Sequence, residues 1–163
     1  MKYRILSDIE LKELETEFVQ FLVSNGIDDA EWKKINSNDA DKAIELVEIF
    51  SDVVFEKAFK KVQFLEHIAP NSIKVFMLGA DKIYLIGVDS THPEIDFRDR
   101  DVLTALASNF NEYREKLHIY KTEKVISENR EAEIFKLMKD GCLVIDENRF
   151  KAFAGLYHCS TIA

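Results

Sequence analysis

The densest set of metal-ligand side chains in this chain lies in the stretch GVDSTHPEIDFRDRD, from Gly87 to Asp101. Carboxylate oxygens suit hard divalent cations and imidazole nitrogens suit softer ones, so a loop of this kind could bind a metal ion that activates water for hydrolysis. The candidate metal ligands are Asp89, His92, Glu94 and Asp96.

The same stretch also fits a polar connector between a strand and a helix. Asp and Ser favour turns, Pro93 favours an extended conformation in the residue before it, and Asp96 or Asp99 can cap a following helix. The order of the residues matches no established ligand spacing, because an EF-hand loop needs a glycine at its sharp turn and here His92 and Pro93 occupy the middle. The metal site and the connector are both compatible with the residues.

His67, in the segment FLEH, is the second residue that could do chemistry. It could act as a general base or a ligand beside Glu66, and it could meet His92 across a hairpin. The structural alternative is a histidine at the C-terminal end of a helix, where its charge interacts favourably with the last carbonyl groups. The candidate catalytic residues are therefore His67, Glu66 and His92.

The two cysteines and the absence of nucleotide-binding motifs limit the other reactions that the chain could catalyse. Cys142 and Cys159 form no CxxC pair, which predicts free thiols in a reducing cytoplasm. His158 and Cys159 are not a nucleophile–base pair by themselves, because adjacent helical residues point about 100° apart. No P-loop, GxGxxG, GxSxG or HExxH pattern is present. We expect no cofactor, with a divalent metal as the alternative.

The charge of the chain argues against nucleic acid and membranes as partners. A net charge of −8, from 22 basic and 30 acidic residues, repels phosphate groups. The segment after CLVI could imitate a recognition helix, but its Arg149 and Lys151 are offset by Asp146 and Glu147. No apolar run reaches the roughly 20 residues that cross a bilayer, and the opening MKYRILSDIELKELE predicts no secretory signal. We expect a cytoplasmic protein.

Helical patterns dominate the first part of the sequence. Ser7 and Glu10 form a capping-box pattern, and the apolar stripe that follows predicts one helix up to Gly26. A short helix is expected after Asp28. The segment NDADKAIELVEIFSDVVFEKAFKKVQFLEH, residues 38–67, has its polar residues in one narrow stripe. It predicts a long central helix that is covered on most of its circumference.

The second part alternates between strand and helix patterns. A β-hairpin is predicted by two β-rich runs, SIKVFML and KIYLIGVD, and one or two short strands by KLHIY and CLVI. Helices are expected from near Asp99, over EAEIFKLMKDG, and after Asp146. The result is an α+β fold, with a long central helix and flanking helices packed on a small antiparallel sheet. Length predicts a single globular domain over residues 1–163.

Three segments of the chain resemble an uncharacterised family of small bacterial proteins. They are the opening MKYRILSDIELKELETEFVQFLVSNGI, the central FSDVVFEKAFKKVQFLEH, and IFKLMKDGCLVI followed by a short helix. The resemblance implies a bacterial cytosolic protein and gives no activity to transfer. It draws attention to Ser51, Asp52, Glu66 and His67, which lie in the matching segments.

Two functional hypotheses follow from this reading. The first is a non-enzymatic binding or regulatory module that acts through protein–protein contacts or self-association, because a rich apolar core accompanies no recognisable catalytic constellation. The second is a small metal-assisted hydrolase that uses His67, His92, Asp89 and Glu94.

Overall fold

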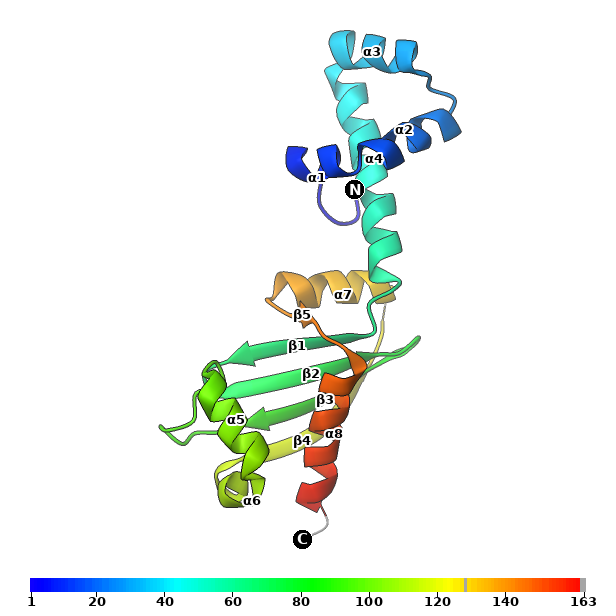
Figure 1. Cartoon of the computed structure of the whole chain (residues 1–163). Helices are drawn as coiled ribbons and strands as arrows, with labels where there is room; N and C mark the ends of the chain where they lie inside the picture. The colour runs from blue at the N-terminus through cyan, green and yellow to red at the C-terminus, as the bar shows by residue number, and fades with distance from the viewer. Residues whose placement is uncertain (128, 162–163) are drawn as a thin grey trace. The chain divides into compact units, whose positions relative to one another are not determined.

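The computed structural model describes residues 1–127 and 129–161 of the chain (Figure 1). The chain forms helices and one five-stranded antiparallel sheet, which confirms the predicted α+β fold class. It divides into two compact units, Met1–Lys61 and Val62–Ala163, called here the helical unit and the sheet unit. The single domain over residues 1–163 stays a prediction.

The helical unit consists of an N-terminal segment and a series of capped helices. Ser7 begins the first helix as predicted, because its side chain accepts from the Glu10 N–H while the Glu10 carboxylate accepts from the Ser7 N–H at 2.8 Å. Asp28 and Asp39 cap two later helices through backbone N–H groups. The helices are α1 (Asp8–Glu13), α2 (Glu15–Ser24), α3 (Asp29–Asn38) and α4 (Ala40–Phe59).

The stretch from Ser7 to Gly26 contains two helices rather than the single one expected. The chain leaves helical geometry at Leu14, with φ −104° and ψ 22°, and begins again at Glu15. Gly26 ends the second helix with a φ of 78°, a conformation that glycine adopts at little cost. The apolar stripe across the break is still used, because residues of both α1 and α2 pack on one cluster.

Helix α4 is the centre of the helical unit. Phe50 is 3% exposed, and its ring lies 5.0 Å from the Phe18 ring, which in turn meets Trp32 edge-on at 5.2 Å. The buried members of this cluster are Leu6, Phe18, Leu22 and Phe50. Helix α4 therefore has the predicted role of a hub within this unit.

The central helix is shorter than predicted, and its apolar surface is less covered. It ends at Phe59, and Phe64–Ala69 forms strand β1 instead of the last turns of the helix. Pairing with a neighbouring strand overrides the helix propensity of this segment. The prediction that most of the helix circumference is covered was also wrong in part, since Ile44, Ile49 and Val53 are 52%, 46% and 50% exposed.

The sheet has the strand order β4-β3-β2-β1-β5, and each neighbouring pair is antiparallel. The predicted hairpin is confirmed, because Ser72 pairs with Asp89 and Leu78 with Ile83. The further strands predicted from KLHIY and CLVI are confirmed as well, and they form the two borders of the sheet. The strands are β1 (Phe64–Ala69), β2 (Ser72–Leu78), β3 (Lys82–Asp89), β4 (His118–Val125) and β5 (Leu143–Val144).

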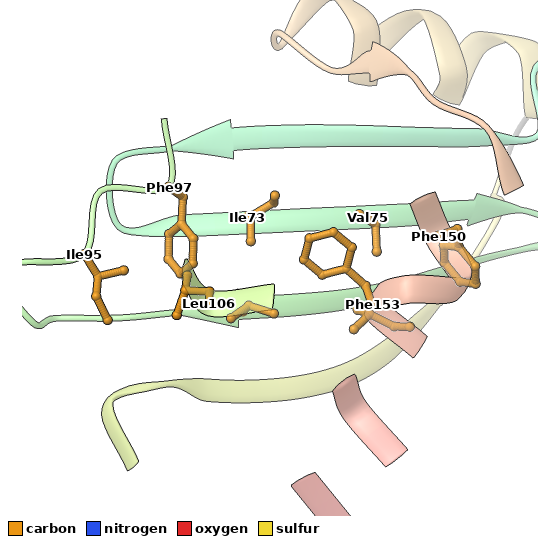
Figure 2. Close-up of a cluster of buried hydrophobic side chains, with 9 residues drawn as sticks. Ile73, Val75, Ile95, Phe97, Leu106, Phe150 and Phe153 are labelled. Atoms are coloured by element: carbon orange, nitrogen blue, oxygen red, sulfur yellow. The ribbon is translucent and has the colours of Figure 1, made fainter. Parts of the chain in front are cut away.

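One face of the sheet carries the hydrophobic core of this unit (Figure 2). Ile73 and Val75 of β2 are fully buried beneath Phe150 and Phe153 of the last helix and Phe97 of the loop after β3. The helices of the sheet unit are α5 (Arg100–Ser108), α6 (Phe110–Tyr113), α7 (Arg130–Lys139) and α8 (Glu147–Thr161), with a 3-10 turn at Arg114–Lys116. Asp99 and Asp146 accept from backbone N–H groups of α5 and α8, as predicted.

Helix α7 lies against the opposite face of the sheet. At its beginning Glu133 pairs with Lys124 of β4 at 2.9 Å, and just beyond its end Gly141 lies beside His67 of β1. Arg130 fixes its first turn by donating to the carbonyls of Gly79 at 3.0 Å and Leu78 at 3.1 Å. The sheet unit therefore has helices on both faces. None of the helices in the described ranges combines the length and apolar character needed to cross a bilayer.

We predict that Phe50→Ala destabilises the helical unit by about 3–5 kcal/mol, the usual cost of a phenylalanine-sized cavity in a core. Urea unfolding followed by the fluorescence of Trp32, the single tryptophan of the chain, reports on this unit directly. The control is Val53→Ala on the same helix, where the side chain is half exposed and a much smaller loss is expected. Equal stability of the two variants would contradict the packing around α4.

Candidate functional site

The acidic loop between β3 and α5 is attached to the sheet unit by apolar and backbone contacts. Ile95 and Phe97 are 5% and 1% exposed and belong to the hydrophobic core. The Phe97 N–H donates to the carbonyl of Pro70 at 2.9 Å, and the Ser90 N–H donates to that of Asn71 at 3.0 Å. The loop therefore packs back on the turn between β1 and β2, as a structural connector does.

Asp89 is held within the sheet by hydroxyl groups. The Ser72 hydroxyl donates to its carboxylate at 2.8 Å, and the Tyr120 hydroxyl is its second partner. Burial, together with the neighbouring Asp89 charge, raises the pKa of Tyr120. The Tyr120 ring lies directly over Gly87, where a Cβ atom would come 2.2 Å from the ring, so this position admits only glycine in the observed arrangement.

His92 and Glu94 lie close together on the outer part of the loop. Glu94 Oε2 is 3.7 Å from His92 Nδ1 and 3.5 Å from the ammonium group of Lys116. The His92 N–H donates to the Ser90 hydroxyl at 3.1 Å, and its Nδ1 atom is buried without a hydrogen-bond partner among the described residues. His92 and Glu94 are therefore neighbours, and Lys116 is a second charged partner of the Glu94 carboxylate.

Asp96 and Asp99 shape the chain before α5. Arg98 donates to Asp96 from its side chain at 2.7 and 3.0 Å, and this ion pair holds the Asp96 pKa at about 2. Asp99 accepts from the Asp101 N–H at 2.8 Å and caps the helix. Both carboxylates have the structural roles that the connector interpretation expects.

The candidate metal ligands thus have separate partners. Asp89 contacts Ser72 and Tyr120, Asp96 contacts Arg98, and only His92 and Glu94 lie together. Within residues 1–127 and 129–161, no three His, Cys, Asp or Glu side chains are grouped in a way that could hold a metal ion.

Glu66 and His67 point to opposite faces of β1, since side chains alternate along a strand. Glu66 forms an ion pair with Arg149 of α8 at 2.8 Å, and Arg149 also lies over the Phe153 ring. His67 lies on the other face, 3.8 Å from the position of a Cβ on Gly141. The expectation that His67 sits at a helix end was wrong, because its segment is a strand.

The structure does not join His67 to His92 within its described part. No hydrogen bond or ion pair connects them there, and the closest acidic neighbour of His92 is Glu94. Cys142 is buried and its thiol pKa is raised to about 11 by that burial, so it is protonated at neutral pH. Cys159 is exposed, and both cysteines are free. We find no activated nucleophile in the described residues.

The contacts that sequence reasoning missed involve Ser51 and Asp52. The Asp52 carboxylate accepts from the N–H groups of Lys2 at 2.8 Å and Tyr3 at 3.1 Å, and the buried Ser51 hydroxyl accepts from the Leu6 N–H at 3.0 Å. These two residues of α4 hold the extended N-terminal segment along the helix. The opening MKYRIL and the FSD motif are therefore structurally coupled, which their shared place in the family resemblance could have suggested.

An apolar ridge on α4 is exposed on the surface of the helical unit. It is formed by Ile49 and Val53, which are 46% and 50% exposed and follow each other at helical spacing, and it continues into Lys57. We refer to these three residues as the α4 ridge. Exposed apolar side chains rimmed by polar residues occur at protein-binding sites.

Grooves flank the α4 ridge on two sides. One, with a volume of about 430 Å³, is lined on the side of the N-terminal segment by Lys2, Asp52, Glu56 and Lys60. The other, with a volume of about 470 Å³, lies between α4 and α2. Its lining includes Leu14, Glu17, Gln20, Phe21, Ser24, Phe50, Val54, Ala58 and Lys61. The ridge and its grooves could receive side chains of a docked helix.

A family model described as a family of unknown function (DUF6495) matches residues 1–158. The chain belongs to this family. Its match confirms the resemblance to an uncharacterised family and covers both the helical unit and nearly all of the sheet unit. No curated protein and no solved structure matches the chain. Family membership therefore supplies no activity, and the function has to be argued from the geometry.

We predict that Asp52→Asn weakens the helical unit by about 1–3 kcal/mol, because hydrogen bonds to a charged acceptor are among the stronger ones. Urea unfolding followed through Trp32 measures the loss. Glu45→Gln removes an exposed carboxylate of the same helix and should leave the unfolding midpoint unchanged. Unaltered stability of D52N would show that the N-terminal segment is held by other contacts.

The Asp96–Arg98 ion pair predicts a specific acid sensitivity. The carboxyl pKa is about 2 in the fold against 3.8 ordinarily, so its stabilising effect is present above the ordinary value and is lost as pH falls towards 2. Asp96→Asn should therefore lower Tm at neutral pH. As the pH is lowered from 3.8 to about 2, the Tm of the variant should fall less than that of the wild type. Thermal unfolding across this range tests the prediction, with Asp81→Asn as the control; an identical pH profile for D96N and the wild type would refute it.

Proposed function

We propose that this protein is a non-enzymatic binding module of the bacterial cytoplasm, and that its helical unit binds an amphipathic helix of a protein partner. The α4 ridge is the observation that carries the proposal. Helix-in-groove recognition uses apolar anchors at helical spacing, and Ile49 and Val53 offer such a surface between two grooves.

The charges around the α4 ridge specify the chemistry of the partner. The helical unit is acidic overall, yet Lys2, Lys57, Lys60 and Lys61 gather around the ridge and its grooves. Glu56 partly neutralises two of them, with Lys2 at 3.5 Å and Lys60 at 4.0 Å, whereas Lys57 and Lys61 form no ion pair with a described residue. A partner helix with apolar side chains flanked by carboxylates complements this pattern.

The contacts that hold the residues around the ridge favour this surface over a random hydrophobic patch. Asp52 lines one groove and simultaneously binds the N-terminal backbone, and Phe50 lines the other while it fills the core. A preorganised surface loses little conformational entropy on binding. The ridge is thus built on a helix that is held by contacts with the N-terminal segment and with the core.

The alternative, a metal-assisted hydrolase, has no comparable support. It needs His67, His92, Asp89 and Glu94 to converge, and in the described residues only His92 and Glu94 are neighbours. The cytoplasmic location is supported by two free cysteines, which are typical of a reducing compartment. The bacterial origin rests on the family resemblance.

We predict that a benzophenone amino acid at position 53 forms a covalent adduct with a protein partner in native cells. Charge reversal by Lys57→Glu together with Lys61→Glu should abolish the adduct, because it removes the cations that meet the partner's carboxylates. Adduct formation is measured on denaturing gels, and thermal unfolding of the K57E/K61E variant checks that the fold is retained.

A matched control places the same photoreactive group at position 41, an exposed residue near the beginning of α4. The proposal expects no adduct there. Absence of any adduct at position 53, or equal labelling at both positions, would overturn it. An adduct that persists in K57E/K61E would show that the partner does not bind through carboxylates, and the proposed acidic helix would be wrong.

A further inference from the structure

Strand β4 is a long edge of the sheet, and no strand of the described residues pairs with its outer side. In Figure 1 it forms one border of the sheet, and the strand order begins with it. It spans His118–Val125 and pairs along its whole length with β3 on its inner side. The opposite border is formed by β5, which has two residues. Backbone groups along an open edge of this length are available to pair with another strand.

The sequence of β4 is complementary to itself in one antiparallel register. Two copies related by a two-fold axis at Thr122 place Lys121 opposite Glu123 of the second copy, and Glu123 opposite its Lys121. The same register brings Ile119 opposite Val125, which is 63% exposed in the single chain. Opposite charges and paired apolar residues directly across strands stabilise a sheet.

Neighbouring registers of the same two-fold arrangement lose this complementarity. A two-fold axis at position 121 would face Lys121 with its own copy, and an axis at position 123 would do the same to Glu123. Like charges directly opposite each other destabilise strand pairing. The charge pattern therefore favours the axis at Thr122 over these two neighbouring axes.

Both charged side chains are exposed and can reach such an interface. Lys121 is exposed and forms no ion pair with a described residue, and the Glu123 side chain is 51% exposed although Lys82 lies 2.6 Å from its Oε1. The strand contains neither proline nor glycine, which are common means of blocking an edge. We propose that the protein forms a symmetric dimer in which β4 pairs antiparallel with β4 of a second copy, giving one continuous ten-stranded sheet.

The test is the association state of the full-length chain, whose mass is 18.9 kDa, measured by sedimentation equilibrium. We expect a wild-type dimer at concentrations of about 100 μM or below. Lys121→Glu or Glu123→Lys alone should weaken the dimer by about tenfold or more, because each substitution creates two like-charge contacts across the axis. An equimolar mixture of K121E and E123K should restore the dimer, since each chain then faces the opposite charge.

Matched controls change the same charges elsewhere in the sheet unit. Lys139→Glu and Glu115→Lys alter exposed residues outside β4 and should leave the dimer intact. A wild-type chain that stays monomeric, a dimer that resists both single substitutions, or a mixture that fails to associate would each overturn the proposal. A dimer that is lost in Val53→Glu and retained in K121E would assign association to the α4 ridge and overturn pairing through β4.

Disulfide trapping tests the register separately. In a Cys159→Ser background, Thr122→Cys places two thiols opposite each other at the axis and should give a covalent dimer on mild oxidation. Lys124→Cys lies two positions from the axis and should not. Trapping through position 124 rather than 122 would refute the proposed register. Because these variants leave α4 unchanged, their outcome is independent of the partner-helix experiment.

Discussion

The pairing of Phe64–Ala69 with β2 is the constraint on which the sheet unit depends. It places β1 between β2 and β5 and turns successive residues to opposite faces. Glu66 thereby reaches Arg149 and fixes α8 over one face, while His67 meets the turn after α7 on the other. If this segment continued the preceding helix, both of these contacts would be lost. A segment with the composition of a helix thus becomes a strand because the sheet offers it two partners.

The helical unit depends on a smaller set of hydrogen bonds between its N-terminal segment and α4. Asp52 and Ser51 supply acceptors for backbone N–H groups of an extended segment that has no strand partner in the helical unit. Leaving those donors unsatisfied next to a packed core would be costly. The anchored segment closes one side of α4, and the α4 ridge remains open. The same helix therefore supports the core with Phe50 and presents a surface with Ile49 and Val53.

Residues that suggest chemistry in the sequence here serve structure in most cases. The acidic loop after β3 looks like a ligand set because turns and helix caps use the same residue types as metal sites. Sequence reasoning identified the capping role of Asp99 correctly, since a cap depends on the nearest backbone alone. It could not foresee that Asp89 joins Ser72 and Tyr120, because that contact requires three strands in register.

The sequence by itself determined the features that depend on local interactions. The α+β class, the β2–β3 hairpin, the caps at Ser7 and Asp146, the helix after Asp28 and the helix end at Gly26 follow from periodicity and near-neighbour hydrogen bonds. Only the tertiary structure decided the strand character of β1, the residues that meet in each buried cluster and the exposure of the α4 ridge. These features depend on which distant segments of the chain pack together. The apolar pattern of one segment indicates that it is buried, but it does not identify the segment that covers it.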